Sequence, residues 1–284
     1  MRIALPAPSQ RVARTVWPDG AKVRQTHERA IPEETAIAFT YGGSSYAVMM
    51  ATPRDLEDFA VGFTLTEGVA AFESEIEHLE IVPEASGIEL RMRLVESREH
   101  AYAERRRHLA GPTGCGLCGI ESLTEAVRAL PRVLAQEVFT TAEIMRAVAS
   151  LPPAQSLNNE TRAAHAAAFW KHGQGLVALR EDVGRHNALD KLAGALARSG
   201  VSPREGIVVV TSRLSVEMIQ KAAMIGAPLI VAVSAPTALA LRTADEAGIC
   251  VIAIARSDGF EVFTHPERIV MESPEEAANV AYGS

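Results

Sequence analysis

Apolar runs and helical segments alternate in residues 206–259, which read GIVVVTSRLSVEMIQKAAMIGAPLIVAVSAPTALALRTADEAGICVIAIARSDG. The continuously apolar runs, typical of strands covered on both faces, are 207–210, 229–233 and 250–255. The segments with helical spacing are 215–225 and 237–247, which close at Gly226 and Gly248. The alternation predicts an α/β unit with parallel strands. The carboxyl ends of these strands share one edge if the crossovers are right-handed.

The rest of the chain extends this prediction in both directions. Upstream elements of the same unit are a helix at 141–150, a hairpin at 163–170 and 176–180, and a helix from about Arg185 to Gly200. Strands before residue 100 are predicted at 36–39, 46–50, 76–82 and 88–94. Between them a helix is expected to start at the N-cap Thr52, with Pro53 in its first turn. We therefore expect an α/β protein, α+β overall, with a strand-rich domain at 1–110, a mobile loop at 111–120 and an α/β domain at 121–284.

Composition excludes several classes of protein. The 284 residues are 48% hydrophobic and 22% charged, which is ordinary for a globular chain. A net charge of -7 argues against general nucleic-acid binding, which needs a basic surface. The longest apolar stretch, 228–241, is interrupted and too short to span a membrane, and residues 1–30 contain no apolar signal segment. Only 3 cysteines occur, which fits a reducing compartment, so a cytoplasmic location is expected.

Cys115 and Cys118 are the residues whose spacing points most directly to chemistry. They lie in the glycine-rich segment 111–119, GPTGCGLCG, which predicts an open loop. Such a pair is typical of a zinc site or of a redox or sulfur-transfer pair, and it also occurs incidentally. A structural zinc needs four ligands, and no second Cys-x-x-Cys or His-x-x-x-His exists in the sequence, so zinc is disfavoured and no metal site is predicted. Cys250, inside an apolar run, is expected to be a buried small hydrophobe.

The surroundings of this pair are positive. The basic run 105–108 lies just upstream, and a helix expected from Glu121 presents its positive end downstream. Both features would favour the reactive thiolate form of a cysteine. A basic run is equally typical of a solvated helix face, so this interpretation stays open.

Polar residues follow each predicted strand at the shared sheet edge. The four loops are 182–187, 211–213, 234–237 and 256–259. Arg185 and His186 begin a helix, where free backbone N–H groups and a guanidinium suit a phosphate, and Ser212 and Arg213 follow the next strand. The four-residue spacings His186–Asp190 and Asn187–Lys191 predict a polar cluster above this edge. The segment before the hairpin places His165 near the same edge, although a structural role is the more typical one for a lone histidine. Helix capping with surface ion pairs is the alternative, but repetition over four loops favours a ligand site.

These motifs together resemble the FdhD family, sulfur carriers that mature formate dehydrogenase. The resemblance runs from about residue 41 to 268, and it rests on Cys115-Gly-Leu-Cys118, EDVGRHNALDK at 181–191, Thr211-Ser-Arg213 with EMIQKAA at 217–223, and Thr264-His-Pro266. It implies that Cys115 accepts sulfur as a persulfide from a cysteine desulfurase and that Cys118 assists or resolves. The implied acceptor is the molybdenum bis-guanine-dinucleotide cofactor of the formate dehydrogenase apoprotein, bound as a substrate. A homodimer would supply two equivalent sites for its two nucleotides.

The resemblance also assigns a cofactor-binding segment and a fold. The segment maps to Ile254, Ala255, Arg256, Ser257, Asp258 and Gly259. This chain has Ala253-Ile254 where the family pattern has Gly-Phe, so aromatic stacking on guanine is not expected here. The family is similar in fold to cytidine deaminases, which implies a three-layer C-terminal domain.

Two other functions compete with the sulfur carrier. A zinc deaminase would need His-x-Glu or Cys-x-Glu and Pro-Cys-x-x-Cys at two helix starts, and residues 185–187 and 211–215 contain neither. A thiol–disulfide regulator that binds a partner enzyme would need only the cysteine pair.

Overall fold

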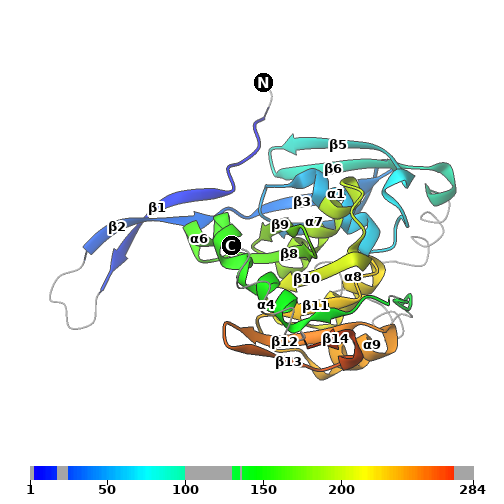
Figure 1. The fold of residues 1–284 in the computed structure, drawn as a ribbon. Coiled ribbons are helices and arrows are strands. Elements are labelled where there is room, and N and C mark those ends of the chain that lie inside the picture. The colour runs from blue at the N-terminus through cyan, green and yellow to red at the C-terminus, as the bar shows by residue number, and fades with distance from the viewer. Residues whose placement is uncertain (1–2, 18–24, 100–129, 135, 272–284) are drawn as a thin grey trace.

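A computed structural model describes residues 3–17, 25–99, 130–134 and 136–271. The central element is a six-stranded mixed sheet in the order β13-β12-β11-β10-β8-β9 (Figure 1). Its strands are β8 (His165–Lys171), β9 (Gly175–Asp182), β10 (Gly206–Val210), β11 (Leu229–Ala232), β12 (Cys250–Arg256) and β13 (Gly259–Val262). No helix in the described part of the chain is both long and apolar enough to cross a membrane.

The three middle strands of this sheet are parallel, and the outer ones are antiparallel to their neighbours. Val209 pairs with Val231 and Val231 with Ile252 in parallel register, whereas β8 runs antiparallel to β10 with Val209 opposite Ala168. As a result, the carboxyl ends of β9, β10, β11 and β12 lie at one edge, together with the amino end of β8. We call this edge the loop edge.

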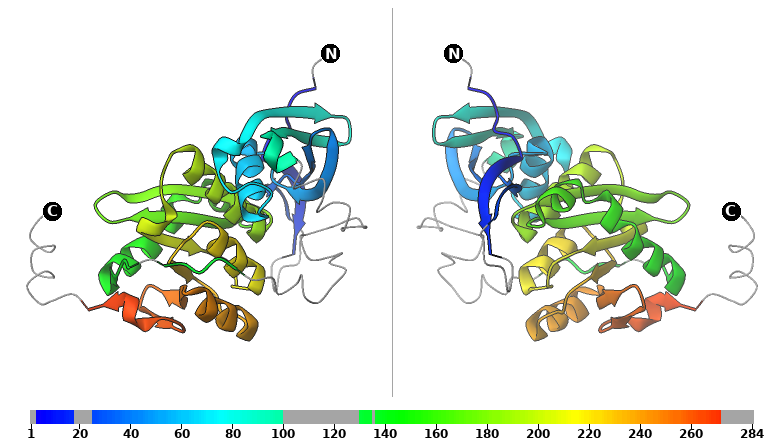
Figure 2. Two further views of the ribbon diagram at one scale, coloured as in Figure 1. Left: turned by 90° about the vertical axis from the view of Figure 1, so that its right-hand side faces the viewer. Right: turned by 90° about the vertical axis from the view of Figure 1, so that its left-hand side faces the viewer.

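Helices cover both faces of the sheet, which confirms the predicted α/β class with three layers (Figures 1 and 2). One face packs against α7 (Arg185–Arg198), α8 (Val216–Met224) and α9 (Ala238–Ala247). The other face packs against α4 (Thr141–Ala149) and α5 (Leu151–Ala154), and α6 (Ser156–Thr161) follows them. Alternate strand residues supply the two cores: Val208 and Val210 face α7 and α8, while Ile207 and Val209 face α4. This double burial explains why the strands read as continuous apolar runs.

A second, four-stranded sheet has the order β4-β3-β6-β5 and precedes the first in the chain. Its elements are β3 (Thr35–Tyr41), β4 (Ser44–Ala51), β5 (Ile76–Glu84) and β6 (Gly87–Leu94), with α1 (Leu56–Thr66) between β4 and β5. Phe39 of β3 packs on α1, with its ring centroid 3.9 Å from that of Phe63 and 4.9 Å from that of Phe59. These rings hold the helix on the sheet through a core of their own.

The predicted start of α1 is wrong. The helix begins at Leu56, after Asp55, whose φ of 54° places it in the left-handed region, and Thr52 is not its N-cap. The backbone N–H of Thr52 instead donates to Asp182 Oδ2 at 3.0 Å, far along the chain. Local capping rules place Thr52 at the helix start, but its backbone N–H is bonded to a carboxylate distant in the sequence.

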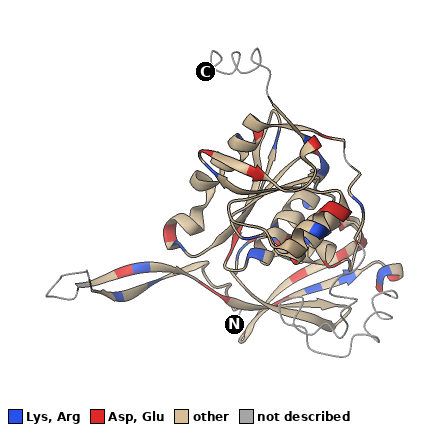
Figure 3. Cartoon of the chain, turned by 90° about the horizontal axis from the view of Figure 1, so that it is seen from below, with Lys and Arg blue, Asp and Glu red and all other residues tan. Residues whose placement is uncertain are grey.

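The sequence prediction also missed a two-stranded ribbon, formed by β1 (Ser9–Val16) and β2 (Gln25–Pro32), which extends away from the body (Figure 1). Charged residues of both signs lie along it (Figure 3). Its base contacts α6, where Arg29 Nη2 donates to the carbonyl of Thr161 at 3.1 Å. Most of its side chains are exposed, so they lack the apolar alternation by which a half-buried strand is recognised.

The remaining elements of the described residues are short. The two strands β7 (Phe139–Thr140) and β14 (Ile269–Val270) pair in parallel, and 3-10 turns lie at Glu73–Glu75, Pro203–Glu205 and Pro266–Arg268.

The two sheets are joined by direct contact between α1 and α7. At their crossing Gly62 faces the backbone of Asp190, and a Cβ at Gly62 would lie 1.7 Å from that carbonyl oxygen. A Cβ at Gly194 would lie 1.9 Å from the carbonyl oxygen of Asp58. Because only hydrogen fits at both positions, the two glycines allow the helices to pack backbone to backbone.

Candidate functional site at the loop edge

Backbone hydrogen bonds fasten the loops of the edge to one another. The N–H of Thr211 donates to Ala166 at 3.1 Å, and that of Val233 donates to Val210 at 3.0 Å. Further along, the N–H of Ile254 donates to the carbonyl of Ser234 at 3.2 Å. The structure therefore brings the loops after β10, β11 and β12 side by side, next to the start of β8.

Arg185 and His186 open α7 at this edge, directly after the N-cap Gly184. Both side chains are half-buried, and Arg185 Nε and His186 Nε2 are inaccessible to solvent without a hydrogen-bond partner in the described structure. Burial, with the nearby positive charges of Arg185 and Lys221, lowers the pKa of His186 to about 4, so its ring is neutral at pH 7. Leaving such buried atoms unpaired costs about 1–3 kcal/mol each. Ligand contact or bound water would remove that cost.

Two further side chains belong to the same neighbourhood. His165, at the start of β8, lies opposite Asp182 of β9, and burial followed by the charge of Arg185 lowers its pKa. Glu217, in the first turn of α8, has its Oε2 atom buried without a hydrogen-bond partner among the described residues. Burial raises the pKa of Glu217, but hydrogen bonding at the helix start and the proximity of His186 and Arg185 outweigh burial and lower it. The sequence prediction placed His165 near this edge but did not single out Glu217.

Ser212 and Arg213 occupy the loop after β10 in different ways. Ser212 is buried, and its hydroxyl donates to the carbonyl of Arg213 at 3.0 Å. The Arg213 side chain is exposed. Of these two predicted site residues, Arg213 offers its charge to solvent while Ser212 shapes the loop.

In the segment from Ile254 to Gly259, the first two residues pack on the core and the following residues form an exposed turn. Ala255 is only 1% exposed, so its side chain fills the core and does not project at the loop edge. Ile254 is partly buried and packs against the core beneath α7, α8 and α9. Its φ of 53° is a conformation that is costly for a β-branched residue. Arg256, Ser257 and Asp258 are exposed. Arg256 Nη1 donates to the carbonyl of Val233 at 3.2 Å, which links this turn to the neighbouring loop.

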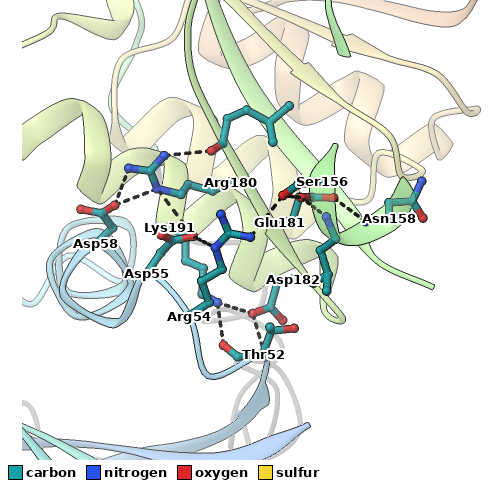
Figure 4. A network of polar contacts seen from close by, with 12 residues as sticks. Thr52, Arg54, Asp55, Asp58, Ser156, Asn158, Arg180, Glu181, Asp182 and Lys191 are labelled. Atoms are coloured by element: carbon teal, nitrogen blue, oxygen red, sulfur yellow. Dashed lines mark hydrogen bonds and ion pairs between the residues drawn. The ribbon is translucent and has the colours of Figure 1, made fainter. Parts of the chain in front are cut away.

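The motif at 181–191 contains residues that join the two sheets, some of which Figure 4 shows, and it also contains Arg185 and His186 at the loop edge. Asp182 is fully buried and lies 2.6 Å from the Nζ atom of Lys191, which in turn donates to the carbonyl of Thr52 at 2.8 Å. The other Asp182 oxygen accepts from the Gly184 N–H at 2.8 Å and from Asn187 Nδ2 at 2.9 Å. Every oxygen of this carboxylate is therefore engaged within the protein.

Asp190, which lies on the same helix as Lys191, makes a second buried connection between the sheets. Asp190 accepts from the Thr66 hydroxyl at 2.6 Å and lies 2.9 Å from Lys221 Nζ. Lys221 also contacts Glu67 at 2.8 Å. The prediction that Asn187, Asp190 and Lys191 lie in a polar cluster above the loop edge is wrong, because these residues are buried against the first sheet and its helix.

A third connection lies nearer the surface. Asp58 of α1 accepts from Arg180 Nε at 2.7 Å and from Arg198 Nη1 at 2.5 Å (Figure 4 shows the Arg180 contact). Glu181 meanwhile accepts from the N–H groups of Leu157 and Asn158 at 2.8 Å each and so holds the start of α6. The charged residues around the motif thus fix the positions from which Arg185 and His186 project.

The cysteine pair predicted to carry the chemistry, Cys115 and Cys118, lies outside the described residues, as do the basic run 105–108 and Glu121. Cys250 is confirmed as a buried residue, with 0% exposure, and burial raises the pKa of its thiol to about 12. Within the described ranges, no group of three or more His, Cys, Asp or Glu side chains could hold a metal ion.

These features define a class of molecule: a mixed α/β protein with a polar loop edge, joined through buried ion pairs to a smaller sheet. The chain belongs to the FdhD/NarQ family, whose family model matches residues 32–270, and this confirms the resemblance seen in the sequence.

Relatives and a solved structure agree with this assignment. The chain is 52% identical to the sulfur carrier protein FdhD of Agrobacterium fabrum, over 95% of this chain and 99% of that protein. It is 53% identical to the sulfur carrier protein FdhD of Brucella abortus, over 87% of this chain and 92% of that protein. A crystal structure assigned as a formate dehydrogenase accessory protein of Desulfotalea psychrophila superposes with a TM-score of 0.72 at 26% identity, covering 93% of this chain and 100% of that chain.

Proposed function

We propose that this protein is a sulfurtransferase that carries sulfur from a cysteine desulfurase to the molybdenum bis-guanine-dinucleotide cofactor of a formate dehydrogenase. The observation that carries the proposal is the 52% identity to a sulfur carrier protein over nearly the full length of both chains. The cofactor is a bound substrate, and the protein contributes no catalytic metal of its own. We expect a homodimer, and a sedimentation experiment that finds only monomer would contradict that expectation.

The loop edge supports the part of the proposal that concerns the nucleotide. Arg185 lies at the start of α7, and Arg213 and Arg256 are exposed on the neighbouring loops. Guanidinium groups and helix N-termini are the usual partners of phosphates. The overall charge of the chain is -7, so these local positive groups matter for holding an anionic ligand.

The buried connections behind the edge supply its rigidity. Asp182, Asn187 and Lys191 tie the start of α7 to Thr52. A site whose supporting residues are locked by hydrogen bonds binds with less loss of conformational entropy. The motif therefore positions Arg185 and His186 without using them in the connection.

The sulfur steps follow from the cysteine pair in the sequence. The Cys115 thiolate attacks the outer sulfur of the desulfurase persulfide, forms its own persulfide and releases the desulfurase thiolate. Attack of the Cys118 thiolate on the inner sulfur of Cys115 then releases the carried atom as sulfide and leaves a Cys115–Cys118 disulfide. The sulfur atom gains the two electrons that the two thiols lose, and a dithiol reductant must later restore the pair.

Intact-mass measurement after incubation with a cysteine desulfurase and cysteine tests the proposal. We expect the wild type to gain one sulfur atom, Cys115→Ala to gain none, and Cys118→Ala to gain sulfur but fail to release it as sulfide. Cys250→Ala is the matched control and should load normally, because this thiol is buried.

Two outcomes would overturn the proposed carrier. One is loading that is unaffected by either change in the pair. The other is a protein that forms the Cys115–Cys118 disulfide yet never takes up sulfur, which is the result expected of a thiol–disulfide regulator.

A further inference from the structure

The ribbon of β1 and β2 has no hydrophobic core of its own. Its strands pair over eight positions, from Ser9 opposite Pro32 to Val16 opposite Gln25. None of its residues belongs to a hydrophobic core of the described chain, and of its described side chains only Ala30 is buried. An isolated two-stranded ribbon is marginally stable at best in water. A ribbon of this length therefore needs a further surface to pack on.

Contacts with the body hold the base and the middle of the ribbon. The Ser9 hydroxyl donates to Glu160 Oε2 at 3.3 Å, and Arg29 Nη2 donates to the carbonyl of Thr161 at 3.1 Å. Beyond Arg29 the ribbon extends away from the body, as Figures 1 and 3 both show. Its outer half, residues 13–16 and 25–28, is therefore in a position to reach another molecule.

One face of the ribbon carries apolar side chains. Successive strand residues point to opposite faces, so Val12 and Val16 share a face with Ile31, which lies opposite Gln10. Ile31 is 41% exposed, and Val12 and Val16 are half-buried. Directly after β1, Trp17 is 71% exposed. Apolar side chains gathered in this way on a protruding element are typical of a protein contact surface.

The ribbon is positive, whereas the rest of the chain is negative. Between their bounds the two strands carry three arginines and one glutamate, a net charge of +2, so the other residues of the chain carry -9. Arg14 lies on the apolar face and Arg11 on the opposite face. Both are exposed, and neither forms an ion pair with another residue that the structure describes. Two ribbons repel each other, but a ribbon and the body of a second copy attract.

We propose that the ribbon is a dimerisation arm that packs on the acidic body of a second copy of this chain, with Val12, Val16 and Ile31 covered and Arg14 paired with a carboxylate. A twofold axis makes this contact twice, once with each arm. One face of an eight-residue ribbon measures about 27 Å by about 10 Å. The two arms and the surfaces they cover then bury about 1,100 Å², which meets the lower limit of about 1,000 Å² for a biological interface.

The inference deepens the homodimer expected above by naming its surface, and it does not depend on sulfur transfer. Sedimentation equilibrium tests it with two double variants on opposite faces of the same ribbon. Arg14→Glu with Val16→Ser alters the apolar face and should weaken the dimer at least about tenfold, because the loss occurs in both arms.

The matched control is Arg11→Glu with Ala13→Ser, which changes the net charge equally but lies on the opposite face. It should weaken the dimer by less than about threefold, because the long-range attraction that it reduces is screened by salt. Neither double variant touches a hydrophobic core of the described chain, so both should keep the far-UV circular dichroism of the wild type.

Photo-crosslinking provides a second measurement that does not depend on these variants. A benzoylphenylalanine replaces Trp17, and unlabelled protein is mixed with protein labelled with ¹⁵N before irradiation. We expect cross-linked peptides that join a labelled chain to an unlabelled one, with the body as the acceptor. Peptides that join only residues of one chain would contradict the arm.

The outcomes separate this inference from the proposed function. A wild type that is monomeric at every concentration would overturn both the expected homodimer and the arm, whereas a dimer that the two double variants weaken equally would overturn the arm alone. Cross-links from position 17 to an added cysteine desulfurase, and not to a second copy, would assign the ribbon to that partner and overturn the inference. Sulfur loading of Cys115 is measured separately, so its failure would leave the arm unaffected.

Discussion

Replacing Lys191 with Met tests whether the buried ion pair holds the two sheets together. The Lys191 side chain is 0% exposed, and its Nζ atom contacts Asp182 Oδ2 at 2.6 Å and the Thr52 carbonyl at 2.8 Å. Methionine has a similar length but leaves the Asp182 charge and the Thr52 carbonyl without the ammonium. Removing one member of a buried pair costs about 3–5 kcal/mol.

The surrounding hydrogen bonds set where in that range the cost falls. Asp182 keeps three donors, the N–H groups of Thr52 and Gly184 and the Asn187 amide, so we expect the lower end, about 3 kcal/mol. For a chain of this size that corresponds to a fall in Tm of about 6–12 °C. A folded protein with about 5–15 kcal/mol of stability survives this loss, so the variant can be measured.

Lys171→Met is the matched control. Lys171 pairs with Glu205 at the surface, where the two side chains are 27% and 51% exposed, and such pairs contribute about 0–1 kcal/mol. Thermal unfolding followed by far-UV circular dichroism, together with urea titration, compares the two variants with the wild type. Equal shifts in Tm for Lys191→Met and Lys171→Met would refute the argument that the pair between the sheets stabilises the fold.

Three further predictions follow from individual residues. Burial lowers the pKa of His186 from 6.5 to about 4, so the contribution of this residue to stability is present above pH 6.5 and declines as the pH falls toward 4. In urea titrations, His186→Gln should therefore lose less stability than the wild type between pH 7 and pH 5. An NMR titration of His186 with a midpoint near pH 6.5 would contradict this prediction. Cys250 should resist alkylation by iodoacetamide until denaturant is added, since its thiol is buried with a pKa raised to about 12, and peptide mapping that finds it labelled in the native protein would show otherwise. Gly194→Ala should cost about 1–3 kcal/mol or more, because its Cβ would lie 1.9 Å from the Asp58 carbonyl oxygen. A Gly194→Ala variant with the Tm of the wild type would refute the close crossing.

The helices and strands of the larger sheet could be predicted because their cues are local. The run 207–210 is apolar throughout since β10 is covered on both faces, and the predicted and observed strands agree there. Thr237 was predicted at the start of its helix, and its hydroxyl does accept from the Ala240 N–H at 3.2 Å. Thr52 has the same local character but a different outcome, because Asp182 and Lys191 engage its backbone.

The candidate site could be predicted only in part. The loops after the parallel strands had to meet at one edge, and Arg185, His186 and Arg213 lie there. Glu217 was not recognised, because a carboxylate in the first turn of a helix is common and only the missing partner of its Oε2 atom distinguishes it. Nothing in the spacing of Ala255 indicated that its side chain fills the core.

The sequence by itself determined the alternation of strands and helices, the edge where the loops gather, and the family. It also predicts a reactive cysteine pair. Periodicity, turn residues and motifs act between neighbours in the chain, so they can be read without coordinates. The tertiary structure alone decided which residues of the motif at 181–191 join the sheets and which project at the edge. Asp182, Asp190 and Lys191 meet partners more than one hundred residues away, and a buried charge is stable only where such a partner is present.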